Sequence, residues 1–146
     1  MTLPGVEGNG VYVYNFEEKR WRLLRVDGEP FRVGELGPGF YIVYFDNLEC
    51  SACKLQDEEL MKAFSEFEKS LLEKLKSVAV VCDWFARRCR SEAAAKTYKL
   101  YDVHMSPTIL VCRVDEGGEY CERLVGVKFA RELYYYLHRI ARRSRA

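Results

Sequence analysis

Two cysteines, Cys50 and Cys53, are the residues whose type and spacing point most directly to chemistry. They follow the apolar run at residues 40–45, and they begin a stretch, residues 51–75, in which leucine and phenylalanine recur at helical spacing. The first turn of a helix offers unpaired backbone N–H groups and the positive end of the helix dipole, which stabilise a thiolate. We therefore expect Cys50 to be an attacking thiol and Cys53, one turn later, a resolving thiol.

The same spacing also occurs in half of a zinc site and in structural disulfides, so the pattern alone leaves these alternatives open. A zinc site needs two further ligands, and the sequence has no second C-x-x-C and no H-x-x-x-H pair. Cys82 and Cys89 are separated by six residues, which suits zinc poorly. We predict no metal and no organic cofactor.

The elements that must position this pair follow from hydrophobic periodicity. Residues 1–10, with three glycines and a proline, predict a loose arm. The remaining pattern predicts a hairpin, four strands and three helices that alternate, which is typical of α/β layers around a mixed sheet. In chain order these are the hairpin at 11–26, strands at 40–45, 78–82, 108–114 and 120–125, and helices at 51–75, 91–101 and 129–140.

A second motif, Ser106-Pro107-Thr108, leads directly into an apolar strand and predicts a turn whose X-Pro bond can be cis. Together with Cys50 and Cys53 it resembles the thioredoxin family. The likeness covers about residues 36–142 and includes Gly126, which precedes the last helix.

The resemblance implies a thioredoxin-like three-layer α/β fold with a mixed central sheet and an extra N-terminal β-hairpin. We expect a single domain, with residues 1–35 as arm and hairpin extension and residues 36–146 as the thioredoxin-like part.

The resemblance also implies dithiol–disulfide exchange by Cys50 and Cys53, with a cis Pro107 facing the pair. Ser106 and Pro107 would offer backbone groups to an extended substrate segment. The implied partners are a disulfide-containing protein substrate and a reductase or dithiol donor. The sequence leaves the direction of exchange open, and the alternative is a non-catalytic interaction module in which the cysteine pair is a static disulfide.

Several positions depart from the family pattern. Glu49 stands where thioredoxins carry tryptophan, Ser51-Ala52 replaces Gly-Pro, and Tyr44 occupies the position of a buried aspartate. The stretch at 83–101 is also longer than the family usually has. These departures indicate a thioredoxin-like protein rather than a typical thioredoxin.

Four residues are candidate modulators of the cysteine pair. Glu49 should oppose a thiolate, whereas Lys54 and the helix terminus should favour one, and the sign of the net effect is open. Tyr44 is either a hydrogen-bonding neighbour of the pair or a packed core aromatic. His104 is either a solvated loop side chain or a group that assists protonation.

The other four cysteines are candidates for two structural disulfides. Cys112 and Cys121 flank a tight turn at 116–117, and a two-residue loop would place them directly across two strands. Cys82 and Cys89 can pair if the intervening loop folds back. The alternative is four reduced cysteines that pack as small apolar side chains.

Charge and hydropathy exclude several classes of protein. The 146 residues carry 23 basic and 22 acidic side chains, a net charge of +1, so we predict no nucleic-acid partner. No apolar run approaches the roughly 18 residues of a membrane span, so we predict no membrane association. The sequence begins without a secretory pattern, which predicts a cytoplasmic protein.

Asparagine and glutamine total four, and arginine outnumbers lysine by 14 to 9. This bias is typical of heat-adapted proteins and indicates a thermophile. In such a source, intracellular disulfides are ordinary.

Overall fold

The central strand, β3 (Gly39–Asn47), is apolar on both of its faces. The structure is a computed structural model that describes residues 3–142. Helices lie against both faces of the sheet, so Tyr41 to Phe45 are fully buried. The strand pairs in parallel with β4 (Leu75–Cys82) and antiparallel with β5 (Thr108–Asp115). The parallel pair places the carboxyl ends of β3 and β4 at the same edge.

The predicted hairpin forms β1 (Gly10–Asn15) and β2 (Arg20–Arg25), which extend the same sheet. Strand β1 pairs antiparallel with β4, and β6 (Gly118–Val125) pairs with β5 at the other end. The described residues thus form a six-stranded mixed sheet in the order β2-β1-β4-β3-β5-β6. This confirms the predicted mixed sheet with an extra N-terminal hairpin.

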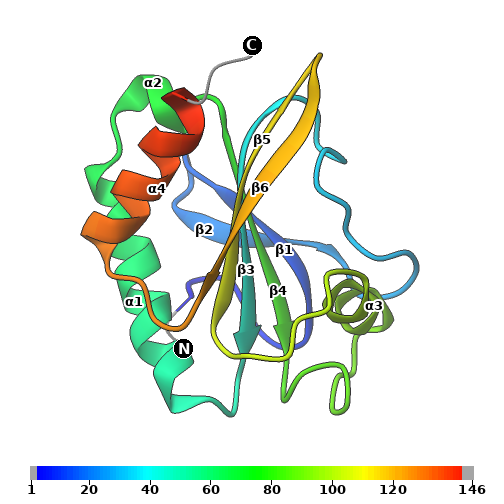
Figure 1. Cartoon of the computed structure of the whole chain (residues 1–146). Helices are drawn as coiled ribbons and strands as arrows, with labels where there is room; N and C mark the ends of the chain where they lie inside the picture. The colour runs from blue at the N-terminus through cyan, green and yellow to red at the C-terminus, as the bar shows by residue number, and fades with distance from the viewer. Residues whose placement is uncertain (1–2, 143–146) are drawn as a thin grey trace.

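Alternation along β3 sorts its side chains into two layers of core. Ile42 and Tyr44 face helices α1 (Ser51–Glu66) and α4 (Ala130–Arg142), which lie on one side of the sheet (Figure 1). Val43 and Phe45 face α3 (Glu92–Leu100) on the other side. The predicted three-layer α/β architecture is therefore confirmed. Within residues 3–142, no helix is both long and apolar enough to cross a membrane.

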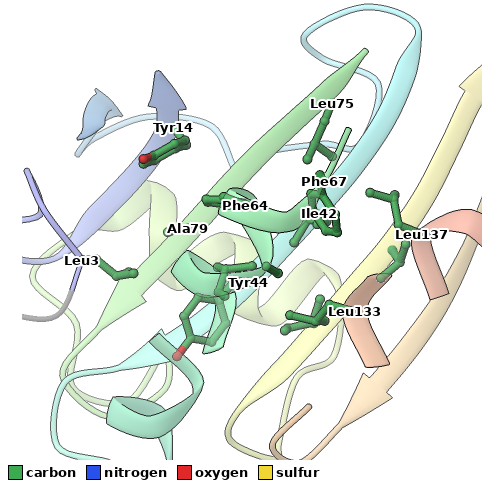
Figure 2. Close-up of a cluster of buried hydrophobic side chains, with 14 of the residues drawn as sticks. Leu3, Tyr14, Ile42, Tyr44, Phe64, Phe67, Leu75, Ala79, Leu133 and Leu137 are labelled. Atoms are coloured by element: carbon green, nitrogen blue, oxygen red, sulfur yellow. The ribbon is translucent and has the colours of Figure 1, made fainter. Parts of the chain in front are cut away.

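The core on the α1 and α4 side joins the hairpin to the rest of the molecule. Figure 2 shows side chains from β1, β3, β4, the α1 region and α4 gathered in one cluster. The ring of Tyr14 packs on Phe64 of α1, with centroids 4.7 Å apart, and on Trp21 of β2, at 5.1 Å. These aromatic contacts bury one face of the hairpin.

The prediction of a loose arm at residues 1–10 is wrong for the residues described. Leu3 and Val6 are 1% and 2% exposed, and the backbone N–H of Trp21 donates to the carbonyl of Pro4. A Cβ at Gly5, where φ is +96°, would lie 2.3 Å from the carbonyl oxygen of Trp21. Pro4 and Gly5 therefore form a tight turn between the buried side chains of Leu3 and Val6. Residues 1–2, which begin the predicted arm, and residues 143–146, which end the predicted thioredoxin-like part, lie outside the described residues.

The predicted helix at 51–75 is too long. Helix α1 ends at Glu66, a short α2 (Lys69–Leu72) follows, and Leu75 already begins β4. Phe67 breaks the helix with extended backbone (φ −73°, ψ 140°). Phe67, Leu71 and Leu75 nevertheless enter the same core as α1, so their spacing continues the pattern across the break.

A disulfide joins Cys112 of β5 to Cys121 of β6, with Cα atoms 4.1 Å apart. The two residues are direct partners in the antiparallel register, because the tight turn pairs Asp115 with Gly118. This disulfide links β6, the edge strand of the sheet, to β5, which pairs with β3.

Replacing both Cys112 and Cys121 by alanine should lower the free energy of unfolding by about 2–3 kcal/mol, because the bridge closes a short loop. Urea denaturation without reductant measures the loss. In excess dithiol, which opens the bridge, the difference from the wild type should shrink. Equal urea midpoints without dithiol would contradict the stabilising role.

Candidate functional site

Cys50 and Cys53 lie where β3 is followed by α1. Cys50 is the N-cap residue of the helix, with extended backbone (φ −107°, ψ 116°), and its Sγ accepts the backbone N–H of Cys53 at 3.2 Å. The sulfur thus takes the place of the side-chain oxygen that usually caps a helix. Both side chains are free thiols, and Cys50 is 8% exposed whereas Cys53 is 1% exposed. Cys50 is the thiol that a second molecule can reach first.

The Cys53 thiol is held in its neutral form. Burial raises its pKa well above the usual cysteine range, and its hydrogen bond with Cys50 acts in the same direction. Ser106 opposes this, because its hydroxyl lies 2.9 Å from the Cys53 Sγ and can stabilise a thiolate. The two cysteines therefore have distinct chemical environments within one helical turn.

The Ser106–Pro107 loop faces this thiol pair, and its peptide bond is cis. The Pro107 carbonyl accepts the backbone N–H of Gly126 at 2.9 Å, and a proline has no N–H to donate. No hydrogen bond of the Ser106 backbone occurs within residues 3–142. Of the two predicted substrate-binding residues, Ser106 has the available backbone groups.

The side chain of Asn47 links the thiol pair to two other segments. Its amide nitrogen donates to the Ser106 hydroxyl at 3.0 Å. Its oxygen accepts the backbone N–H of Phe85 at 2.8 Å and the hydroxyl of Tyr98 at 2.9 Å. This amide is 1% exposed, so its position depends on these partners.

A buried polar cluster lies beneath Cys53, centred on the hydroxyl of Tyr44. This oxygen is 2.6 Å from Asp57, 3.1 Å from Asp46 and 3.0 Å from the carbonyl of Cys53. A tyrosine hydroxyl has a single proton to donate, so it cannot fully satisfy three acceptors. Burial raises the pKa of Asp46 well above its usual range and the neighbouring Asp57 raises it further, whereas the hydrogen bond from Tyr44 lowers it. The net effect favours the protonated form of Asp46.

Burial also raises the pKa of Tyr44 well above 10, so its hydroxyl stays protonated. The Tyr44 hydroxyl joins the two carboxyl groups. Within the described part of the chain, no group of three or more histidine, cysteine or acidic side chains is arranged to hold a metal ion.

The remaining predicted modulators lie at the rim. Glu49 forms an exposed ion pair with Arg88, which offsets its charge beside the thiols. Lys54 is exposed on α1. His104 is exposed and pairs with Asp102, its Nε2 lying 2.6 Å from the carboxylate oxygen. Tyr44 is thus the predicted modulator that contacts the backbone of the cysteine pair.

A second disulfide, between Cys82 and Cys89, closes what we term the 82–89 loop. This loop lies beside the thiol pair, because the backbone N–H groups of Leu48 and Glu49 donate to the carbonyls of Cys82 and Asp83. Both cysteine pairs that the sequence left open are therefore bridged, and Cys50 and Cys53 are the free ones.

Three polar residues of the site, Asp46, Asn47 and Asp57, were not singled out from the sequence. The signal for the first two was a polar pair at the carboxyl end of a buried strand, directly before the cysteines. The signal for Asp57 was its position four residues after Cys53, on the same face of α1.

Comparison with known proteins supports the fold. No protein-family model and no curated protein sequence matches the chain. A solved thioredoxin from Aeropyrum pernix is 20% identical with a TM-score of 0.63, covering 92% of this chain and 96% of that one. A Trichomonas vaginalis thioredoxin is 12% identical with a TM-score of 0.56, covering 79% and 96%. The Trx4 domain of ERdj5 is 14% identical with a TM-score of 0.59, covering 81% and 96%.

These structures are similar to the chain over nearly their whole length, at identities that establish the fold alone. The chain has a thioredoxin-like fold, as its sequence motifs predict.

Asp46→Asn should make the free energy of unfolding less dependent on pH. Above pH 3.8 the unfolded Asp46 loses its proton while the buried one keeps it, so wild-type stability falls as pH rises. Each unit of raised pKa corresponds to about 1.4 kcal/mol, and an amide at this position can replace the protonated carboxyl.

Urea denaturation between pH 4 and pH 8 measures this dependence. The substitution Asp27→Asn, at an exposed aspartate, is the matched control and should follow the wild type. Parallel wild-type and Asp46→Asn curves would mean that Asp46 is ionised in the folded state.

Proposed function

We propose that the protein is a thiol–disulfide oxidoreductase that acts on protein disulfides through Cys50 and Cys53. The observation that carries the proposal is the asymmetry of the pair. Cys50 caps the helix N-terminus and is the more accessible thiol, whereas Cys53 is buried and protonated one turn later. The thioredoxin-like fold and the Ser106–Pro107 loop opposite the pair support it further.

In the reducing direction, the Cys50 thiolate attacks one sulfur of a substrate disulfide. A bond forms between the two sulfurs, and the second substrate sulfur leaves as a thiolate that takes up a proton. Cys53 then loses its proton and attacks the Cys50 sulfur, which releases the substrate as a dithiol. Two electrons pass to the substrate, and a dithiol donor or partner reductase restores the Cys50 and Cys53 thiols.

The second step requires removal of a proton from a buried thiol. The Ser106 hydroxyl, 2.9 Å from the Cys53 sulfur, stabilises the thiolate as it forms. A negative charge on Asp46 disfavours the same thiolate, so the step is easier while Asp46 keeps its proton. Burial and the neighbouring Asp57 favour this neutral form, whereas the hydrogen bond from Tyr44 acts against it. We assign Tyr44, Asp46 and Asp57 a positioning role.

Cys50→Ser should reduce the rate at which dithiothreitol reduces insulin disulfides to the rate without enzyme, because no attacking thiol is left. Cys53→Ser should instead accumulate a covalent mixed disulfide with the substrate, because the resolving thiol is missing. Non-reducing electrophoresis and mass spectrometry detect the adduct. The Cys112→Ala/Cys121→Ala variant serves as control and should keep its activity. Turnover by Cys50→Ser would sink the proposal.

A redox titration separates the proposed enzyme from an interaction module with a static disulfide. After equilibration at a series of dithiol/disulfide ratios, alkylation and peptide mass spectrometry report each cysteine pair. We expect the Cys50–Cys53 pair to titrate alone, between about −180 and −270 mV. A pair that stays oxidised far below about −300 mV would favour the module.

A further inference from the structure

A pocket of about 370 Å³ lies between the 82–89 loop and the C-terminal part of α3. Its apolar walls are Trp84, Phe85, Ala86, Tyr98 and Val103. The rings of Trp84 and Phe85 meet edge to face with centroids 5.0 Å apart, and Phe85 meets Tyr98 in the same way at 5.9 Å. Trp84 and Phe85 are only partly buried, so aromatic surface faces the pocket. Its volume is in the range of small-ligand sites.

Besides Tyr98, the charged and titratable residues that line this pocket are basic, and one of them, His104, pairs with Asp102 outside the lining. Arg87, Lys99 and His104 line it, and each is exposed. None of the described residues that line the pocket is acidic. An apolar cavity with this rim favours a ligand that combines a large apolar group with a negative charge.

Hydrogen bonds connect two residues of the pocket to the proposed exchange site. The backbone of Phe85 and the hydroxyl of Tyr98 both donate to Asn47, which in turn donates to the Ser106 hydroxyl beside Cys53. His104 of the rim precedes Ser106 by two residues, which span at most about 7 Å of chain. A segment that bonds to the Ser106 backbone therefore has the pocket within reach of its neighbouring residues.

We propose that this pocket is a specificity subsite for the substrate protein, an inference that rests on the proposed function. The pocket binds a large apolar side chain of the substrate, preferably an aromatic one. This side chain lies two or three residues along the substrate chain from the cystine that reacts with Cys50. An acidic residue next to that side chain pairs with Arg87 and Lys99. The subsite is built by residues 84–87 of the 82–89 loop and by residues 98, 99, 103 and 104.

Peptides of equal length test this preference. Each contains one intramolecular disulfide flanked by Phe-Asp, Ala-Asp, Phe-Lys or Ala-Lys, and hydroxyethyl disulfide serves as a substrate without side chains. With dithiothreitol as donor, kcat/KM should be at least tenfold higher for the Phe-Asp peptide than for the Ala-Lys peptide. Equal values for the four peptides would overturn the proposal.

Two variants assign the preference to the pocket. Trp84→Ala should lower kcat/KM about tenfold for the Phe peptides, while hydroxyethyl disulfide stays within twofold of the wild type. Arg87→Glu, at an exposed position, should reverse the preference between Phe-Asp and Phe-Lys. The matched controls Tyr135→Ala and Arg131→Glu lie on α4, on the opposite face of the sheet, and should change neither. An equal loss for all substrates in Trp84→Ala, with no reversal in Arg87→Glu, would overturn the subsite.

A binding measurement separates this inference from the proposed function. The same peptides, reduced and S-methylated, are titrated into the wild type by calorimetry. The Phe-Asp peptide should bind at least tenfold more tightly than the Ala-Lys peptide, even if no exchange of any disulfide is detected. Equal binding of the two peptides would overturn the subsite, even if hydroxyethyl disulfide is reduced.

Discussion

The buried side-chain amide of Asn47 is the interaction on which the arrangement of this site depends. An amide without water must find protein partners, because an unpaired buried polar group costs several times the net value of a hydrogen bond. Asn47 finds them in Phe85, Tyr98 and Ser106, which are 38, 51 and 59 residues away in the chain. Three segments are thereby held at fixed positions around the cysteine pair.

This amide is at the right place because β3 and β4 run in parallel. Their carboxyl ends meet at one edge of the sheet, where Asn47 is opposite Cys82. The same edge receives the N-terminus of α1, so the helix dipole, the thiols and the 82–89 loop converge there. The disulfide between Cys82 and Cys89 closes this loop, in which Phe85 donates to Asn47 and Trp84 forms part of the pocket wall.

Burial divides one helical turn into two chemically different thiols. Cys50 caps the helix and is 8% exposed, whereas Cys53 is 1% exposed and lies above the polar cluster of Tyr44, Asp46 and Asp57. Position 44 has a tyrosine where the family resemblance leads one to expect a buried aspartate. The structure provides carboxyl groups at that depth from two other positions, and the tyrosine hydroxyl joins them. Position 44 therefore lacks the aspartate, but Asp46 and Asp57 still place carboxyl groups near Cys53.

The sequence alone determined the parts of this protein that depend on local pattern. The six-residue apolar run predicted the central strand, the two-residue cysteine spacing predicted thiols on one helical turn, and the tight turn at 116–117 made the Cys112–Cys121 pairing reachable. Hydrophobic periodicity wrongly predicted a continuous helix over residues 67–75. Phe67, Leu71 and Leu75 all enter one core, so their spacing stays the same although the helix ends at Glu66. Composition likewise failed at residues 3–9, where glycine and proline mark turns that pack against Trp21.

Only the tertiary structure decided which polar residues belong to the site. Asp46, Asn47 and Asp57 differ little in sequence from other surface-type residues, and their role follows from burial and from partners far along the chain. The pairing of Cys82 with Cys89 and the pocket beside it also depend on how one loop folds back against α3. Apart from the Cys82–Cys89 bridge, which spans seven residues, these are long-range contacts that no local spacing encodes, because they arise only when the sheet brings separate segments to the same edge.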